Sequence, residues 1–228
     1  MFGFTKRECA LWGGSLLSLL VAFLLFDRTS WLSLIASAIG VTALIFNAKG
    51  NPVGQLLIIV FSLFYGYISF TFAYYGEMIT YLGMTAPMAL LALITWLRHP
   101  YKGHRTEVAV ARLKRGEVWW MLLLTALVTA VFYPILRHFH TENLLPSTLS
   151  VTTSFLAVYL TFRRNPFFAL AYAANDVILI LLWWLASLHD ASYISVTVCF
   201  VIFLVNDLYG FWAWRKMERK QNETEKST

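Results

Sequence analysis

The chain has 228 residues, of which 59% are of apolar or aromatic types and only 13% are charged. A soluble domain usually carries about 25% charged residues, and a globular protein of this size cannot hide so much apolar surface. The composition therefore excludes a soluble enzyme, a disordered chain and a secreted disulfide scaffold. It predicts an all-α integral membrane protein that lies in a lipid bilayer.

The net charge of +6 does not indicate a nucleic-acid partner, because the basic residues fall between apolar segments rather than along one face. The two cysteines, Cys9 and Cys199, lie far apart without a CxxC pair or a Cys/His spacing, so we expect no metal, redox site or cofactor. Lys6 and Arg7 precede an apolar run that lacks a small-residue cleavage site, which predicts a retained first helix.

Eight segments can each cross about 30 Å of hydrocarbon, which takes about 20 mostly apolar residues. In an eight-helix arrangement, all 18 Lys and Arg residues except Arg28 and Arg137 fall on one side of the membrane. Cytoplasmic loops collect Lys and Arg, so we expect both termini in the cytoplasm. In chain order the segments are 9–26, 31–47, 53–75, 78–97, 117–136, 147–162, 166–188 and 191–214.

Two stretches of the chain look like copies of one three-helix unit. Each has an Asn-Pro pair, Asn51-Pro52 or Asn165-Pro166, 114 residues apart, at the start of a long aromatic helix, where the first turn tolerates proline. The copies predict a 3+1+3 plan of parallel triple-helix repeats, as some transporters have. The plan divides the chain into an extra N-terminal helix (1–29), a first unit (30–98), a cytoplasmic loop and linker helix (99–140), a second unit (141–217) and a polar cytoplasmic tail (218–228).

The seventh and eighth segments carry the same polar dipeptide, Asn175-Asp176 and Asn206-Asp207, whereas the first six contain no acid or base well inside the apolar region. Both asparagines lie nine residues from the inner end of their helix, at a depth of about 13–14 Å. Ionisable groups at this depth are costly and usually face a cavity or a partner. The equal depth predicts one site. The alternative is that these side chains simply bond the two helices together.

Aromatic and hydrogen-bonding side chains occur near this level. Gln55 and Ser62 are seven residues apart and share a helix face, and Trp183 is a candidate for stacking, although Trp is also enriched at membrane interfaces. The motifs GxSxG, HExxH, GxGxxG and the P-loop are absent from the sequence, so we expect neither catalysis nor metal binding. The candidate substrate-binding residues are Gln55, Phe61, Ser62, Tyr65, Asn175, Trp183, Asn206, Asp207 and Tyr209.

These residues carry a resemblance to a known family. The helix plan, the Asn-Pro helix starts, Asn175-Asp176 with Trp183-Trp184, and the ending NDLYGFWAWR from Asn206 to Arg215 resemble the PnuC family of nicotinamide riboside transporters, bacterial inner-membrane relatives of the SWEET sugar transporters. The resemblance covers about residues 31–217.

The resemblance implies uptake of nicotinamide riboside, a precursor of NAD, by facilitated diffusion through a central alternating-access site, with intracellular phosphorylation trapping the substrate. It also implies a homotrimer. Similar proteins carry thiamine or other vitamins, so another vitamin is an alternative substrate. A membrane-embedded enzyme acting on head groups and a non-catalytic scaffold are the alternatives from other functional classes.

Overall fold

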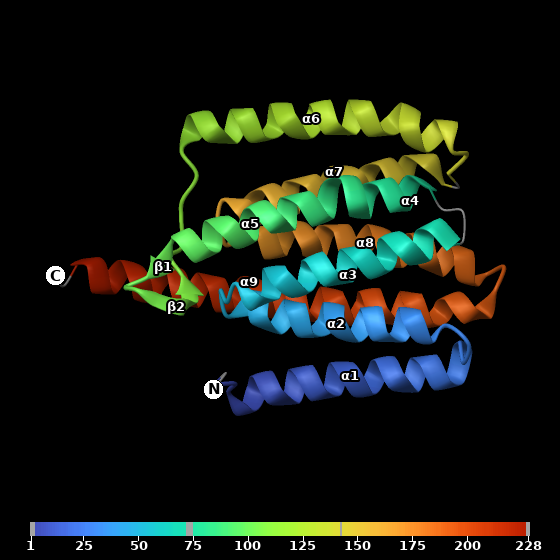
Figure 1. Ribbon diagram of the computed structural model, residues 1–228, viewed down its shortest axis with the longest axis horizontal. Coiled ribbons are helices and arrows are strands. Elements are labelled where there is room, and N and C mark those ends of the chain that lie inside the picture. Colours follow the sequence, from blue (N-terminus) through green and yellow to red (C-terminus); the bar gives the residue numbers. More distant parts are fainter. Residues whose placement is uncertain (1–2, 72–74, 142, 227–228) are drawn as a thin grey trace.

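The computed structural model describes residues 3–71, 75–141 and 143–226. Within these residues, eight helical segments are long and apolar enough to span a membrane, as predicted. They run side by side along the long axis of the molecule, with both chain ends at the same end of the bundle (Figure 1). The helices are α1 (Lys6–Phe26), α2 (Trp31–Ala48), α3 (Val53–Thr71), α4 (Tyr75–Ile79), η1 (Thr80–Thr85), α5 (Ala86–Arg98), α6 (Arg115–His138), α7 (Leu144–Phe162), α8 (Phe167–Ser187), η2 (Ala191–Tyr193) and α9 (Ile194–Lys226).

The polar connection expected over 99–115 contains a short hairpin. Strands β1 (Pro100–Tyr101) and β2 (His104–Val108) pair antiparallel. Lys102 and Gly103 between them both have positive φ, 48° and 80°. Two left-handed residues in a two-residue loop are typical of a hairpin turn that matches the twist of its strands. The hairpin is the only strand pair in the described residues, so the fold is nearly all helical.

Helix α9 is longer than the predicted segment 191–214, because it continues through most of the expected polar tail to Lys226. Its extension is held by the hairpin connection. Glu218 is buried and accepts a hydrogen bond from Arg112 at 3.0 Å, and Gln221 accepts one from the backbone of Val110 at 2.8 Å. The tail is therefore helical where its polar residues have partners, and residues 227–228 lie outside the described residues.

The predicted helix 78–97 is a longer span that has three parts, α4, η1 and α5. The middle part is a π-helical turn, in which the Thr85 hydroxyl bonds the carbonyl of Thr80, five residues back, at 3.2 Å. Such turns insert an extra residue into a helix and frequently lie at functional sites. The predicted third segment, 53–75, corresponds to α3, which ends at Thr71, and residues 72–74 lie outside the described residues.

The helices form two units of corresponding construction. The first unit contains α2, α3 and α5, and the second contains α7, α8 and α9. Between the units, α2 packs against α9 and α5 packs against α7. The first helix of each unit therefore contacts the third helix of the other, an arrangement consistent with the predicted triple-helix repeats.

The turn after the first helix of each unit has the same backbone design. Gly50 and Arg164, which are 114 residues apart, both adopt the left-handed conformation, with φ of 63° and 57°. The next residue in each copy, Asn51 or Asn165, accepts a side-chain hydrogen bond from the backbone N–H two residues later. These asparagines start the following helices, as the Asn-Pro pairs predicted.

Helices α1 and α6 lie at opposite edges of the bundle (Figure 1), and each packs on the first helix of the unit that follows it, α2 or α7. The first turn of α1 and of α6 contains a glutamate. This glutamate forms an ion pair with a basic residue in the loop that follows α2 or α7. Glu8 pairs with Lys49 at 3.1 Å, and Glu117 pairs with Arg163. Because Lys49 and Arg163 are also 114 residues apart, α1 and α6 occupy corresponding places. The correspondence extends each three-helix unit to a half of four helices.

Close packing between α2 and α3 depends on Gly54. A Cβ atom there would lie 2.7 Å from the backbone nitrogen of Asn47 and would also strike the Asn47 side chain. We expect Gly54→Ala to cost about 1–3 kcal/mol of stability, because the helices must separate to accept the methyl group. Melting of the purified protein checks this, with Gly14→Ala as the control, since a Cβ at Gly14 meets no atom within 4 Å. Equal melting of both variants contradicts the expectation.

Candidate functional site

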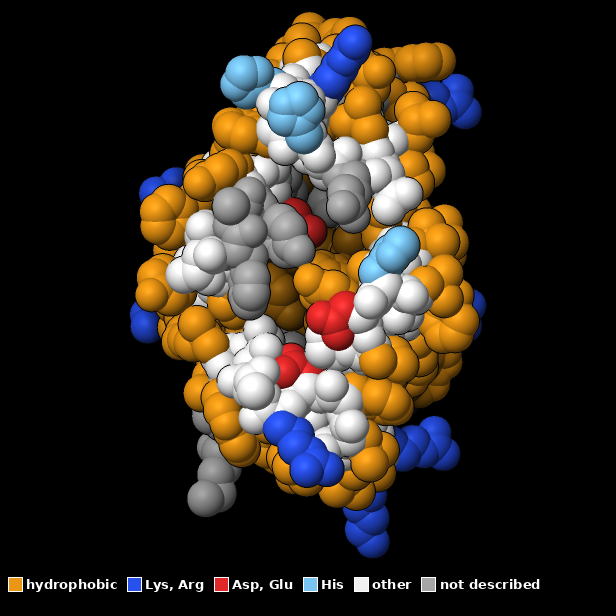
Figure 2. All heavy atoms as spheres, turned by 90° about the vertical axis from the view of Figure 1, so that its right-hand side faces the viewer, with side chains coloured by type: hydrophobic (Ala, Val, Ile, Leu, Met, Phe, Trp, Pro, Cys, Tyr) orange, Lys and Arg blue, Asp and Glu red, His pale blue; other side chains and the backbone are white. Residues whose placement is uncertain are grey.

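A cavity of about 150 Å³ lies between the two units, and its wall combines side chains from α2, α3, α4, η1, α7, α8 and α9. At the end of the molecule opposite the chain termini, the surface is hollowed between the helices (Figure 2). The polar residues in the cavity wall are Asn47, Glu77, Thr80, Thr85, Thr141, Ser147, Ser150, Ser154, Asn175, Asp176 and Asp207.

Asn175, on α8, is buried in this wall with half of its hydrogen-bonding capacity used. Its side-chain oxygen accepts hydrogen bonds from Ser150 and Thr153 of α7, both at 2.9 Å. These bonds orient the amide, and among the described residues its nitrogen donates no hydrogen bond. An amide nitrogen carries two donors, so Asn175 can bind an oxygen atom of a ligand in the cavity.

Asp176 and Asp207 bring a carboxyl pair to the same cavity, from the neighbouring helices α8 and α9. Both are buried, and their carboxyl groups interact directly with each other. Within the described residues, one oxygen of Asp176 has no hydrogen-bond partner. Two buried carboxylates repel each other unless a proton or a cation compensates their charge. The pair therefore suits a ligand with positive charge.

Aromatic rings form part of the wall on both sides. Phe61, Tyr65 and Tyr81 make a three-ring cluster, with centroid distances of 4.7 Å between Phe61 and Tyr65 and 5.3 Å between Tyr65 and Tyr81. Trp183 reaches the cavity from α8 and packs on Tyr193 at 5.4 Å. Trp183 thus lines the cavity, where the alternative was a position at the membrane interface alone.

Glu77 and Tyr81, which line the cavity from α4 and η1, were not among the predicted residues. The fourth span begins at Tyr75, so it includes Glu77 in its first turn. Glu77 is therefore at the end of the span and not well inside the apolar region, where no acid was expected in the first six helices. The sequence places Glu77 one residue before the predicted helix, where it looked like a loop residue. The polar residues Thr80 and Thr85 in the same span are the sequence signal that could have indicated a cavity-facing side of this helix.

Gln55 and Ser62 share a helix face as predicted, but neither contributes to the cavity wall. Gln55 donates a hydrogen bond to the Asn47 side chain at 2.8 Å, and Asn47 does line the cavity. Ser62 is fully buried and bonds the carbonyl of Ile58 in its own helix at 2.8 Å. Gln55 therefore orients the side chain of Asn47, which lines the cavity. Ser62 is packed between helices.

Asn206 and Tyr209 also lie outside the cavity wall. Asn206 points toward α1, where its amide donates to the Ser15 hydroxyl at 3.0 Å and to the carbonyl of Ile202 at 2.8 Å. Tyr209 contacts Glu8 of α1 at 3.4 Å. The depth of Asn206 suggested one site with Asn175, but neighbouring residues on a helix point about 100° apart, and Asp207 takes the cavity-facing position instead.

The end of the bundle that carries the termini is closed by a layer of buried aromatic side chains. Trp96 and Trp214 are fully buried with their rings 5.4 Å apart. The Trp96 indole donates to the carbonyl of Thr161 at 2.9 Å, and the Trp214 indole donates to that of Asn47 at 2.7 Å. Each bond joins the third helix of one unit to the first helix of the other. Two equivalent cross-unit bonds therefore hold the units together at this end.

In the described residues, no group of three or more His, Cys, Asp or Glu side chains is arranged to hold a metal ion. The two cysteines are free and far apart in the fold, one exposed and one buried. The side chains that line the cavity offer hydrogen bonds, charge and aromatic contact to a ligand.

Comparison with known proteins gives a consistent result. Residues 30–216 match a family model described as nicotinamide mononucleotide transporter. The nicotinamide riboside transporter PnuC of Neisseria mucosa is 27% identical over 225 residues, which cover 96% of this chain and 85% of that protein. PnuC of Haemophilus influenzae is 22% identical over 194 residues, which cover 85% and 83%. A crystal structure of the vitamin B3 transporter PnuC has the same fold, with a TM-score of 0.82, 23% identity and coverage of 97% of this chain and 95% of that chain.

The contact between Asn206 and Ser15 generates a prediction about stability. Asn206→Leu and Ser15→Ala should each lower the melting temperature, because either change removes the bond between α9 and α1. Such interhelical bonds contribute about 0.6 kcal/mol on average in membrane proteins. The double variant should therefore lose less than the sum of the single losses, as measured by unfolding of all three proteins. Strictly additive losses would show that the two side chains do not interact.

Proposed function

Since the chain belongs to the nicotinamide mononucleotide transporter family, whose members are transporters and not enzymes, we propose that it carries nicotinamide riboside by facilitated diffusion. The observation that carries the proposal is the cavity between the units, where a free amide donor and a carboxyl pair lie beside aromatic rings. Two relatives named as nicotinamide riboside transporters support this choice of substrate.

The proposed substrate has three features that the cavity matches. Its flat cationic ring suits aromatic faces such as Trp183 and Tyr65, a contact worth about 0.5–2 kcal/mol. Its positive charge suits Asp176 and Asp207, and its hydroxyl or carboxamide groups suit the free donors of Asn175. The proposed binding residues are therefore those sequence candidates that line the cavity, Phe61, Tyr65, Asn175, Trp183 and Asp207, with Glu77, Tyr81 and Asp176 added.

We place the protein in the bacterial inner membrane with both termini in the cytoplasm. Nearly all Lys and Arg residues fall on the side that carries the termini, and basic residues accumulate on the cytoplasmic side of membrane proteins. In this orientation the hollow of Figure 2 faces outward. The closed end, with Trp96 and Trp214, faces the cytoplasm.

The way in which the units meet supports the proposal of alternating access. Rocking one unit against the other around a central site is a known transport mode, and the contacts that must change are those of α2 with α9 and α5 with α7. Release into the cytoplasm requires the two indole bonds, Trp96 to Thr161 and Trp214 to Asn47, to open. Because these bonds are equivalent in the two units, the closed end can open symmetrically.

Facilitated diffusion runs downhill, so uptake continues only while free substrate inside stays low. Phosphorylation in the cytoplasm, which the family resemblance implies, maintains that gradient. We also propose, on the same resemblance, that the protein assembles as a homotrimer in the bilayer.

A matched pair of asparagine variants tests the binding site. Asn175→Leu removes the free donors from the cavity, so it should weaken nicotinamide riboside binding by about 5- to 150-fold, the cost of one lost hydrogen bond of about 1–3 kcal/mol. Asn206→Leu makes the same chemical change at the same depth but faces α1, so it should leave affinity within about twofold. Calorimetric titration of both purified proteins measures this. Equal loss in the two variants would place the ligand elsewhere.

Transport by reconstituted protein tests the proposed function itself. Proteoliposomes should take up nicotinamide riboside until the inside and outside concentrations are equal, with no change when ionophores remove ion gradients. Unlabelled substrate loaded inside should accelerate entry of labelled substrate, since alternating access exchanges one for the other. Preference for thiamine in a competition panel would select the alternative vitamin, and accumulation above the outside concentration would exclude facilitated diffusion.

A further inference from the structure

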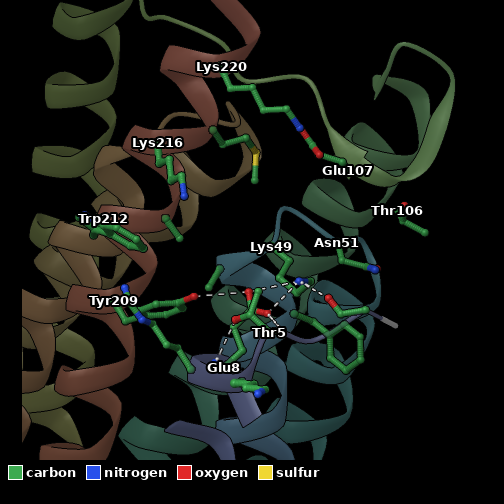
Figure 3. Close-up of a pocket in the computed structure, with 17 residues that line it drawn as sticks. Thr5, Glu8, Lys49, Asn51, Thr106, Glu107, Tyr209, Trp212, Lys216 and Lys220 are labelled. Carbon is green, nitrogen blue, oxygen red and sulfur yellow. Dashed lines mark hydrogen bonds and ion pairs between the residues drawn. The ribbon is translucent and has the colours of Figure 1, made fainter. Parts of the chain in front are cut away.

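A second and larger cavity, of about 860 Å³, lies at the end of the bundle that carries the termini (Figure 3). It is bounded by the first turn of α1, the end of α2, strand β2 and the extension of α9 from Tyr209 to Lys220. The two tryptophans that close the central site, Trp96 and Trp214, are not part of its wall. This pocket and the central cavity share no lining residue.

The wall of this pocket carries an excess of positive charge. Five cationic side chains and two carboxylates line it, a net charge of +3, and the cations are Lys6, Arg7, Lys49, Lys216 and Lys220. The carboxylates already have partners. Glu8 binds Lys49, the backbone of Thr5 and the Tyr209 hydroxyl, and Glu107 accepts a hydrogen bond from Gln221 at 3.0 Å.

Four of the cations form no ion pair among the described residues, namely Lys6 and Arg7 on α1 and Lys216 and Lys220 on α9. Lys216 instead lies over the Trp212 ring, with its nitrogen 5.5 Å from the ring centre. Figure 3 shows Lys220 directed toward Glu107 across the top of the pocket. The unpaired cations come from two helices that both line the pocket, so their charges add in a space that attracts an anion.

An exposed apolar stripe on α9 continues from the pocket into the membrane region. Val201, Val205, Leu208 and Trp212 follow one another at steps of three or four residues, and each is about half exposed. Steps of this size keep side chains on one helix face. The stripe spans about 16 Å at 1.5 Å per residue, and Trp212 belongs to both the stripe and the pocket wall.

We propose that this pocket binds one anionic phospholipid from the leaflet at that end of the bundle. The phosphate lies among Lys6, Arg7 and Lys216, and an acyl chain follows the α9 stripe. Basic pockets between transmembrane helices on the cytoplasmic side bind lipid head groups in this way. The site differs from the transport site in ligand, location and charge, and it joins α1 to α9 at the membrane surface.

Native mass spectrometry of the full protein in detergent tests the proposal, with dioleoyl phosphatidylglycerol as the probe and dioleoyl phosphatidylcholine for comparison. We expect the wild type to bind the anionic lipid more tightly. The double variant Lys6→Gln, Lys216→Gln should bind it about 30-fold more weakly, from about 1 kcal/mol for each charge. A second pair, Arg7→Gln with Lys220→Gln, should show a loss of the same direction, and melting without lipid checks the folding of each variant.

The matched control is Lys102→Gln with Arg105→Gln, which removes the same charge from the hairpin outside the pocket. This control should bind like the wild type. Equal losses in the control and pocket variants would overturn the proposal, because only overall charge would then matter. Equal binding of the two lipids would overturn it too. Displacement of the lipid by an equal concentration of glycerophosphoglycerol, which has no acyl chains, would identify a water-soluble phosphate ligand instead.

Discussion

A bilayer provides no water to hydrogen-bond a polar group, so every polar side chain inside this bundle must find a protein partner or face a cavity. This constraint accounts for the bonds of several polar side chains in the membrane region. Ser62 bonds its own backbone, Asn206 bonds α1 and Gln55 bonds Asn47. Other groups in this region lack such partners among the described residues. The amide nitrogen of Asn175 and one oxygen of Asp176 are in the wall of the central cavity, whereas the side-chain oxygen of Asn206 is buried outside it.

Hydrogen bonds to buried polar groups also hold the two units together at the closed end. The indoles of Trp96 and Trp214 each satisfy a backbone carbonyl at the end of a helix in the opposite unit. Each carbonyl also accepts a backbone N–H from the turn that follows its helix, Gly50 to Asn47 and Arg164 to Thr161, both at 2.9 Å. The indole bond uses the second lone pair of the carbonyl oxygen while it joins the units, and breaking it leaves a buried indole N–H that must find another partner.

Much of the architecture could be predicted from the sequence, because apolar length and the placement of Lys and Arg depend on composition alone. Eight spans and the paired Asn-Pro turns are visible as patterns along the chain. The direction in which a side chain points is different, since it depends on how each helix is rotated against its neighbours. Depth placed Asn206 beside Asn175, but rotation turned it toward Ser15. Glu77 was missed because the predicted span began at residue 78, whereas the helical span in the structure begins at Tyr75. The helical tail was missed because its partners lie in and beside a hairpin that is distant in the sequence.

The matching ion pairs of Glu8 with Lys49 and Glu117 with Arg163 indicate a repeated half of four helices, and this number bears on the direction of membrane insertion. A half that contains four helices starts and finishes on the same side of the membrane, whereas a half of three does not. Joining two four-helix halves end to end therefore preserves the direction of insertion without any added segment. Both halves of the protein therefore have the same orientation in the membrane, because each contains an even number of helices.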